Sequence, residues 1–218
     1  MKQLVVVIPT RNRLEKLKKA LDSIPLLDYI YILVVCDGDR PTYEYLLKER
    51  SISNLKVVLV PQHKGAVYCR NSGIRGLEDG VLCATDDIVF EKHAIQHAFE
   101  CFNKNFPDDD GVVGFVQDLK FHPTGVALVG KNFLKRYPNG QLFYPKYWHF
   151  ACQEILSYCN LLGNRFVQDL SAKIIHFHPS ILKGNFVDKT HEDARLFKKK
   201  DMALKDKRLK EGKVWPVS

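Results

Sequence analysis

The sequence predicts an α/β fold: a mixed, mostly parallel sheet flanked by helices, with a helical extension at the C-terminus. Short runs of β-branched residues alternate with segments of helical periodicity through the first half of the chain. This alternation is typical of parallel strands joined by crossover helices. The second half contains shorter strand candidates between polar turns, and the chain closes with a long charged helix.

The first half contains four strand and helix pairs in order. Residues 4–8 read Leu-Val-Val-Val-Ile, a run typical of a strand that is buried on both faces. Apolar side chains then recur at helical spacing over residues 14–24, and Pro25 ends that helix because it cannot continue the hydrogen-bond ladder. By the same criteria we expect further strands at residues 30–35, 55–60 and 81–84, and further helices at 43–51, 65–77 and 93–102.

The second half is predicted to add strands at residues 112–116, 126–129 and 174–178, and helices at 150–162 and 190–210. Residues 107–111 read Pro-Asp-Asp-Asp-Gly, which indicates a turn and a soft boundary. We therefore divide the chain into residues 1–110, residues 111–182 as a second half of the same domain, and a basic helical extension at 183–218.

Composition limits the class of protein. The chain has 218 residues, of which 45% are hydrophobic and 27% charged, so it can bury a core and is not wholly disordered. No apolar run is long enough for a membrane span or a signal peptide, and the six cysteines are scattered as in a reducing compartment. These features predict a cytoplasmic protein without stable membrane insertion.

Charge indicates an anionic partner. The formal net charge is +8, and residues 183–213 contribute five of these charges, with eleven Lys and Arg against six Asp and Glu. A basic surface of this kind attracts nucleotides, nucleic acid or a membrane surface. The final helix has a thin apolar stripe at Ala194, Phe197 and Leu204, so we expect it to pack partly on the body.

Polar residues follow three of the predicted strands, at residues 9–11, 37–39 and 85–87. Ligands of open α/β sheets bind at the carboxyl ends of the strands, where these residues would lie. Asp86 and Asp87 are adjacent, and two carboxylates repel unless a cation or water separates them. Mg²⁺ and Mn²⁺ typically take one or two carboxylates together with the oxygens of a bound diphosphate.

Four motifs, in order, resemble the donor-binding half of family 2 glycosyltransferases, which have the GT-A fold. They are Val-Val-Val-Ile-Pro-Thr-Arg-Asn-Arg at residues 5–13, Val-Val-Cys-Asp-Gly-Asp at 34–39, Gly65 with Arg-Asn-Ser-Gly at 70–73, and Ala-Thr-Asp-Asp-Ile at 84–88. The chain differs from the family pattern at Cys36, where an acid is common, and at Thr85, where the metal motif often has its first aspartate.

The resemblance implies a nucleotide-sugar donor, with UDP as the favoured nucleotide, and Mn²⁺ or Mg²⁺ as cofactor. Residues of the four motifs would each contact a different part of the donor. The implied roles are a nucleotide pocket at Pro9, Thr10 and Arg11, a hydrogen bond from Asp37 to the base, Arg70 near the diphosphate, Asp86 near the ribose or sugar, and Asp87 on the metal ion.

The resemblance also implies residues in the second half. Residues 147–154 are similar to the segment that supplies the catalytic base, in which Glu154 is the only acid; Asp169 is the alternative. Inverting transfer needs a carboxylate that takes the proton of the acceptor hydroxyl. His176 and His178 lie in a late strand that resembles one where a histidine completes the metal shell, and alternation places both on one face.

Several alternatives stay open. A nucleotidyltransferase on a related sheet would also use a divalent ion, but it typically opens with a glycine-rich loop, which residues 9–13 lack. A non-enzymatic nucleic-acid-binding protein would use the basic extension. For a glycosyltransferase the acceptor could be a polysaccharide, a lipid-linked glycan or a hydroxymethylated DNA base.

Residues 125–132 nearly match a P-loop, but Asn132 stands where that motif needs a Ser or Thr to bind Mg²⁺, so we interpret this segment as structural.

Overall fold

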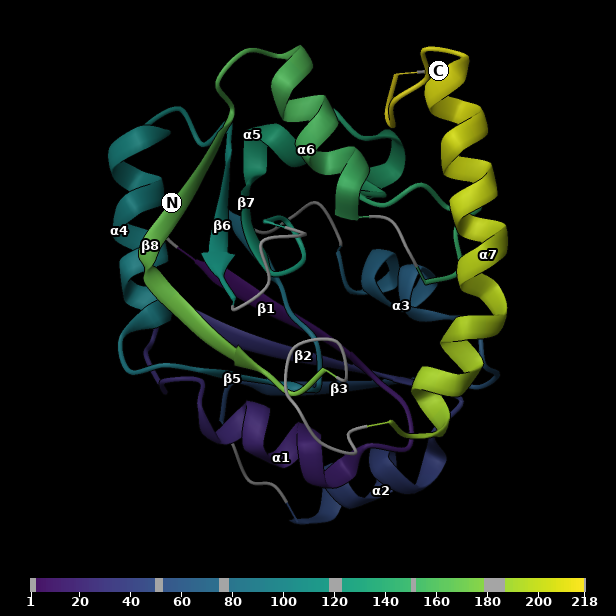
Figure 1. The fold of residues 1–218 in the computed structure, drawn as a ribbon. Coiled ribbons are helices and arrows are strands. Elements are labelled where there is room, and N and C mark those ends of the chain that lie inside the picture. Colours follow the sequence, from purple (N-terminus) through teal and green to yellow (C-terminus); the bar gives the residue numbers. More distant parts are fainter. Residues whose placement is uncertain are drawn as a thin grey trace.

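The computed structural model describes residues 3–49, 53–74, 79–117, 123–149, 152–178 and 187–217. Within these ranges, eight strands form one sheet in the order β3-β2-β1-β4-β7-β6-β8-β5 (Figure 1). The strands are β1 (Leu4–Thr10), β2 (Ile30–Asp37), β3 (Leu55–Val60), β4 (Gly80–Cys83), β5 (Ile88–Phe90), β6 (Val112–Val116), β7 (Ala127–Gly130) and β8 (Phe166–His176). The helices are α1 (Leu14–Asp22), α2 (Arg40–Glu49), α3 (Ala66–Gly73), α4 (Ala94–Asn105), α5 (Lys131–Leu134), the 3-10 turn η1 (Pro138–Gly140), α6 (Cys152–Leu161) and α7 (Lys189–Lys210).

The sheet is mixed. β1 to β4 run parallel to one another, β7 pairs antiparallel with β4 and β6, and β8 pairs parallel with β6. The predicted α/β class is confirmed, and one continuous sheet passes through both predicted halves of the chain. Turns at Pro107–Gly111 therefore separate two parts of one sheet, because β4 pairs with β7 across that point.

Helices cover both faces of the sheet. Alternate residues of β1 point to opposite faces, so Val6 and Ile8 pack with α1, α2 and α4, whereas Val7 packs with α3, α5 and α6. All three side chains are fully buried. The β-branched run of the first strand thus has the two-sided burial that its sequence indicates.

Strand β8 is the main difference from the predicted elements. It begins at Phe166, whereas the sequence indicated a strand only from residue 174. Exposed or half-exposed polar side chains, including Gln168 and Ser171, occupy its first part, so it lacks the apolar pattern of a buried strand. The three-residue strand β5, which pairs antiparallel with β8, was likewise not predicted because it is too short to show periodicity.

Residues 125–132, which nearly match a P-loop in sequence, have a structural role. Residues 127–130 form β7 and the chain turns directly into α5 at Lys131, without a phosphate-cradling loop. A Cβ atom on Gly130 would lie 2.3 Å from the carbonyl oxygen of Asp109, so the close approach of these two chain segments requires glycine. This glycine serves packing.

Helix α7 packs on the body along one edge of the molecule, from the vicinity of α2 to that of α6 (Figure 1). The ring of Phe197 stacks on Trp148 with centroids 4.3 Å apart and planes inclined by 15°. The buried carboxylate of Asp201 accepts hydrogen bonds from the backbone N–H groups of Trp148, at 3.1 Å, and His149, at 2.8 Å. The C-terminal extension is therefore an integral part of the domain.

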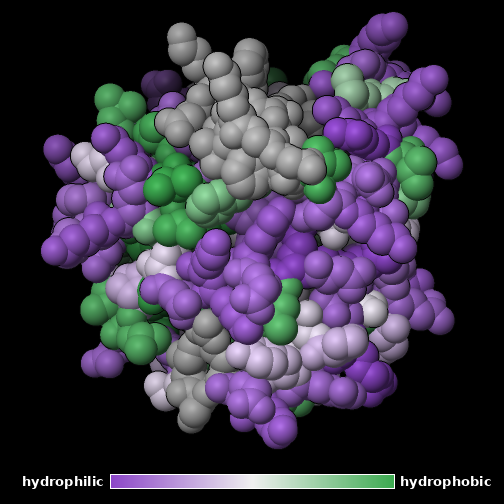
Figure 2. Space-filling view, turned by 60° about the horizontal axis from the view of Figure 1, so that its bottom comes forward, coloured by the Kyte–Doolittle hydropathy of each residue, from purple (hydrophilic) through white to green (hydrophobic). Residues whose placement is uncertain are grey.

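The outward face of α7 is basic. Arg195, Lys198, Lys199 and Lys200 are exposed. Figure 2 shows the edge on the side of α7 as mostly hydrophilic, with a few separate hydrophobic side chains. In the described part of the chain, no helix is both long enough and apolar enough to cross a bilayer.

We expect Phe197→Ala to lower the free energy of unfolding by about 2 kcal/mol, because it removes a half-buried ring and its stacking on Trp148. Leu196→Ala, at the neighbouring position but 71% exposed, is the matched control and should change stability by less than about 0.5 kcal/mol. Urea denaturation of both variants measures the difference. Equal effects would mean that α7 does not pack on the body through Phe197.

Candidate functional site

The carboxyl ends of β1, β2 and β4 meet at one edge of the sheet. β1 lies between β2 and β4, so the chain reverses its direction of travel across the sheet beside β1. Such a switch point leaves a crevice beyond the strand ends, where α/β proteins bind ligands. Thr10, Asp37 and Asp86 stand at these ends, and all three are buried.

A cavity of about 80 Å³ lies at this edge, and we call it the strand-end cavity. Its walls come from the β1–α1 loop, the ends of β2 and β4, α3 and its preceding loop, the loop before α6, and the start of α7. The lining residues are Pro9, Thr10, Arg11, Arg13, Asp37, His63, Gly65, Ala66, Arg70, Thr85, Asp86, Trp148, His149, Thr190, Asp193 and Ala194.

The structure brings together all six residues for which the sequence predicts contact with the nucleotide or sugar. Pro9, Thr10, Arg11, Asp37, Arg70 and Asp86 line the strand-end cavity. The three residues predicted to bind metal, Asp87, His176 and His178, are outside the cavity lining, and Asp87 adjoins the lining through Arg13, whose Nη1 lies 3.3 Å from its Oδ2. Glu154 is outside the cavity lining.

Arg13 lies between the two adjacent aspartates. Its Nη1 is 3.1 Å from Oδ1 of Asp86 and 3.3 Å from Oδ2 of Asp87, and its side chain is only 8% exposed. Asp86 also accepts a hydrogen bond from the hydroxyl of Thr10 at 2.9 Å, and Asp87 accepts one from Thr85 at 2.8 Å. The repulsion expected between the two carboxylates is thus offset by a guanidinium and two hydroxyl donors.

The two carboxyl groups have opposite pKa shifts. Burial, with a further contribution from the neighbouring charge of Asp87, raises the pKa of Asp86 to about 6. Burial alone would also raise the pKa of Asp87, but the hydrogen bond and charge of His176, and the charge of Arg13, hold it well below its usual range. Both carboxyl groups are largely ionised at neutral pH, but Asp87 stays ionised well below the pH at which Asp86 takes up a proton, so Asp87 better suits a cation.

His176 faces Asp87 from the end of β8. Its Nδ1 lies 2.8 Å from Oε1 of Gln117, which can only accept, so Nδ1 carries the proton. Its Nε2 lies 3.2 Å from Oδ1 of Asp87. A hydrogen bond to Asp87 requires a proton on Nε2 as well, and a metal ion between the ring and the carboxylate would take the place of that proton.

Two further imidazoles adjoin this pair. The ring of His178 lies 5.4 Å from that of His176 and 5.2 Å from that of His191, measured between centroids. Burial and the charge of His176 lower the pKa of His178 to about 4. Nε2 of His191 lies 3.8 Å from Oδ2 of Asp87, a contact from α7 that the sequence pattern did not indicate.

The donor set fits a divalent ion that is only partly held by protein. Within the described ranges, no group of three His, Cys, Asp or Glu side chains converges as a metal cluster. Mn²⁺ and Mg²⁺ at nucleotide sites need only one or two protein ligands, because phosphate oxygens and water supply the rest. Asp87 with His176 forms such a pair, and imidazole with carboxylate favours Mn²⁺.

Asp37 organises the loop before α3. Its Oδ1 accepts from the backbone N–H of Lys64 at 2.7 Å, and its Oδ2 accepts from that of Gly65 at 2.9 Å. Nδ1 of His63 lies 2.6 Å from the same Oδ2, and the His63 ring packs edge-on against Trp148. Asp37 therefore fixes one wall of the cavity through His63.

Arg70 is the cation of the cavity that no carboxylate occupies in the described part of the chain. It projects from the last turn of α3, and its nearest aromatic neighbour is the Phe143 ring, 5.5 Å from the guanidinium carbon. Its Nε is buried and has no hydrogen-bond partner among the described residues. A buried N–H donor without an acceptor is costly, and an anion in the cavity would satisfy it.

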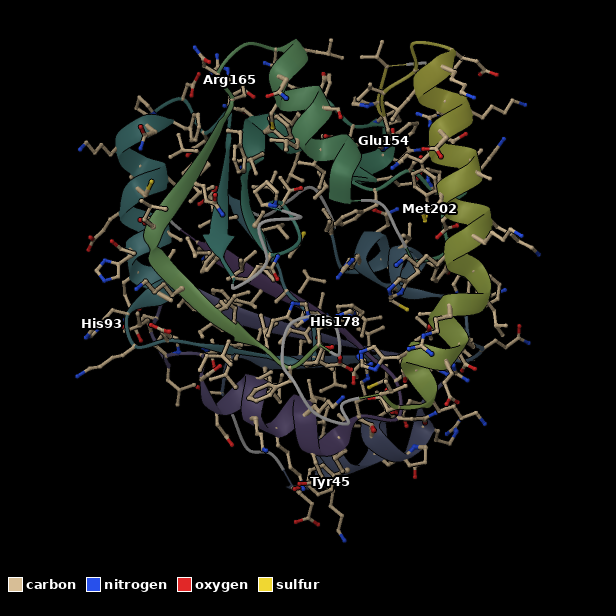
Figure 3. The ribbon with its side chains drawn as sticks, in the orientation of Figure 1. Tyr45, His93, Glu154, Arg165, His178 and Met202 are labelled. Carbon is tan, nitrogen blue, oxygen red and sulfur yellow. The ribbon has the colours of Figure 1, made fainter. Side chains whose placement is uncertain are left out.

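Glu154 is bound on both of its carboxylate oxygens. Oε1 accepts from the hydroxyl of Tyr147 and, at 3.1 Å, from Nε of Arg208; Oε2 accepts from Nη2 of Arg208 at 3.1 Å and from the backbone N–H of Trp215 at 2.6 Å. Figure 3 shows Glu154 between α6 and α7, well apart from His178. The alternative acid, Asp169, lies on β8 and accepts from the backbone N–H of Ser171.

Sequence reasoning missed the contributions of Arg13, His63 and α7. Arg13 and His63 flank recognised motifs, and their charge and position were the available signals. Thr190 and Asp193 of α7 also line the cavity, although they lie far from the β1–α1 loop in sequence. Only the folded chain reveals that the C-terminal helix reaches the strand-end cavity.

No protein-family model matches the chain, and no curated protein matches its sequence. Solved structures do match its fold. TarS of S. aureus (residues 1–349) has a TM-score of 0.63 at 19% identity over 80% of this chain and 60% of its own length. The mannosyltransferase PcManGT of Pyrobaculum calidifontis, in complex with GDP-Man and Mn²⁺, has a TM-score of 0.63 at 15% identity over 84% of this chain and 58% of its own.

A second structure of TarS 1–349, in complex with UDP-GlcNAc, has a TM-score of 0.62 at 18% identity over 79% of this chain and 58% of its own length. The chain thus spans about three fifths of the structures that it matches. At these identities the likeness concerns the fold. The chain has the GT-A-like fold that its sequence predicts.

Proposed function

We propose that the protein is a glycosyltransferase that moves a sugar from a nucleoside diphosphate donor to an acceptor hydroxyl with inversion. The observation that carries this proposal is the gathering of six residues from four separate motifs around one cavity at the switch point of the sheet. The structural neighbours support it, since one is bound to UDP-GlcNAc and another to GDP-Man. UDP is the donor nucleotide that the sequence resemblance favours.

The chain's own residues divide the work on the donor. Arg70 would bind the diphosphate, because its buried Nε lacks an acceptor. Asp86 and Thr10, hydrogen-bonded to each other, would contact the ribose or sugar, while Pro9 and Arg11 line the nucleotide pocket. Asp37 would hydrogen-bond the nucleobase of the donor, on the side of the cavity where it already binds His63.

Asp87 and His176 would hold a divalent ion, and His178 would support His176 from the adjacent position. When bound, Mn²⁺ or Mg²⁺ would neutralise the charge of the departing diphosphate. Mn²⁺ accompanies the donor in PcManGT. The acceptor class is a polysaccharide, a lipid-linked glycan or a hydroxymethylated DNA base, and the exposed lysines of α7 suit an anionic one.

Asp87→Asn should lower kcat/KM for donor turnover by about 100-fold or more, since it removes the ionised carboxylate from the proposed ion. The measurement is release of the nucleoside diphosphate from a panel of UDP- and GDP-sugars with Mn²⁺, repeated with EDTA. Binding of Mn²⁺, followed by electron paramagnetic resonance, provides a readout that does not depend on turnover.

Asp28→Asn is the matched control, because Asp28 is exposed and lies in the loop between α1 and β2. It should retain wild-type turnover. Metal-independent hydrolysis that is equal in wild type and Asp87→Asn would contradict the metal's role. Release of pyrophosphate from a nucleoside triphosphate, with no sugar-nucleotide turnover, would favour a nucleotidyltransferase instead.

For Glu154 we propose an anchoring role in the arrangement seen here, in place of the catalytic base that the resemblance implied. Its carboxylate and the Arg208 guanidinium are both buried, and the pair joins α6 to the end of α7. Arg208 in turn lies over the Tyr144 ring, 3.7 Å from its centroid. A base needs a free oxygen within reach of the acceptor, and both oxygens of Glu154 are engaged.

Glu154→Gln and Arg208→Met should each lower the free energy of unfolding by about 3–5 kcal/mol, because either change leaves the other charge buried without its partner. Stability is measured by denaturation, and turnover is measured well below both melting temperatures. Turnover should fall equally in the two variants. A loss of kcat in Glu154→Gln that exceeds that in Arg208→Met by about 100-fold would instead identify Glu154 as the base.

A further inference from the structure

Both arginines of the β1–α1 loop are bound by carboxylates at the start of α7. Nη1 of Arg11 lies 2.6 Å from Oδ2 of Asp193. Nε and Nη2 of Arg13 form a two-pronged contact with Asp188, at 2.9 Å each. The hydroxyl of Thr190 donates to the backbone oxygen of Arg11 at 2.9 Å, and Nη2 of Arg13 lies 2.9 Å from Nδ1 of His191, so four residues at the start of α7 contact this loop.

The start of α7 narrows the strand-end cavity. The strand-end cavity measures about 80 Å³, and Thr190, Asp193 and Ala194 of α7 form part of its wall. Pockets for small-molecule ligands are typically about 300–1,000 Å³. A nucleoside diphosphate sugar is larger than this cavity, so we expect the start of α7 to shift when the donor binds.

Carboxylates and phosphates are alternative partners for the same guanidinium. Arg binds either group through two parallel N–H···O bonds, and the geometry of Arg13 on Asp188 is of this kind. Arg70, the third arginine of the cavity, has no such carboxylate among the described residues and retains an unsatisfied Nε. Residues at the start of α7 thus supply carboxylates to Arg11 and Arg13, Arg13 also contacts Asp86 and Asp87, and Arg70 has no carboxylate partner among the described residues.

We propose that Arg11 and Arg13 bind the diphosphate of the donor, and that Asp188 and Asp193 occupy these arginines in its absence. The start of α7 is then an intramolecular stand-in for the donor's phosphates, which the donor displaces on binding. The inference rests on the proposed function, since it assigns further binding residues to the same site.

The rest of α7 is held differently, so only its start has to move. Asp201 and Arg208 are buried and make hydrogen bonds to the body. Asp188 and Asp193 are each 29% exposed, so water and an incoming anion can reach both ion pairs, whereas Asp201 and Arg208 are buried. An anionic donor accompanied by a divalent ion can replace both carboxylates at the arginines.

The test is isothermal titration of the full chain with UDP, GDP or inorganic pyrophosphate in the presence of Mn²⁺. Asp188→Asn/Asp193→Asn should lower the Kd of the diphosphate by about tenfold, since the competing carboxylates of α7 are removed and Arg13 keeps only its contacts to Asp86 and Asp87. Asparagine is suitable because Asp188 also caps α7 by accepting from the His191 N–H, a bond that an amide oxygen can accept. Arg13→Gln, added to the double variant, should reverse the gain.

Glu192→Gln is the control for a general charge effect, because Glu192 is an exposed acid of the same helical turn and its change removes one negative charge, half of what the double variant removes. The proposal is overturned if the double variant binds the diphosphates no more tightly than Glu192→Gln does. It is also overturned if neither wild type nor the double variant binds any of the three anions. Failure of the proposed function looks different: the double variant gains affinity for the diphosphate, yet no sugar nucleotide is turned over.

A second readout separates displacement from a general loosening of α7. Hydrogen exchange at the backbone amides of residues 189–194 should speed up when UDP and Mn²⁺ are added to wild type, while exchange at residues 201–208 stays slow. Unchanged exchange at 189–194 on saturation with UDP would show that the donor enters without displacing α7, and would overturn the proposal.

Discussion

The structure of the site depends on one electrostatic constraint, the burial of two adjacent carboxylates at the end of β4. Asp86 and Asp87 are each 3% exposed, and a buried carboxylate is unfavourable unless a cation or hydrogen-bond donors compensate it. Arg13 supplies the cation from the β1–α1 loop, and His176 supplies a second partner from the end of β8. These contacts bind the β1–α1 loop and the end of β8 to the same pair of acids.

Helix α7 follows from the same constraint. Arg13 cannot be satisfied by Asp86 and Asp87 alone, because the Nε edge of its guanidinium points away from them and binds Asp188. The ion pairs then continue outward from the aspartates, since Asp188 also binds Lys16. The position of the C-terminal helix is therefore coupled to the charge state of the cavity, and an anion or cation that enters the cavity must alter these pairings.

Much of the fold and part of the site could be predicted from the sequence. The buried strands were predicted because apolar runs such as residues 4–8 have a strong local pattern, and Thr10, Asp37 and Asp86 followed from strand-end position. The first part of β8, before residue 174, could not be predicted, because its exposed face carries polar residues and its partners are distant in sequence. Glu154 was chosen by resemblance to a motif, and only the folded chain shows that Arg208 and Trp215 bind it.

The apolar stripe of α7 shows most clearly what the sequence pattern alone cannot predict. Ala194, Phe197 and Leu204 form a sparse stripe in the sequence, yet the positions that would complete its spacing of three and four residues are Asp201 and Arg208, both buried. The helix thus packs through two satisfied charges at places where hydrophobic residues would be expected, and it keeps its lysines outward. The basic surplus of this segment consequently belongs to the outer face of α7. The face toward the cavity carries Asp188 and Asp193. Because its charges are divided in this way, α7 can cover a site for anions and still present a basic surface to solvent.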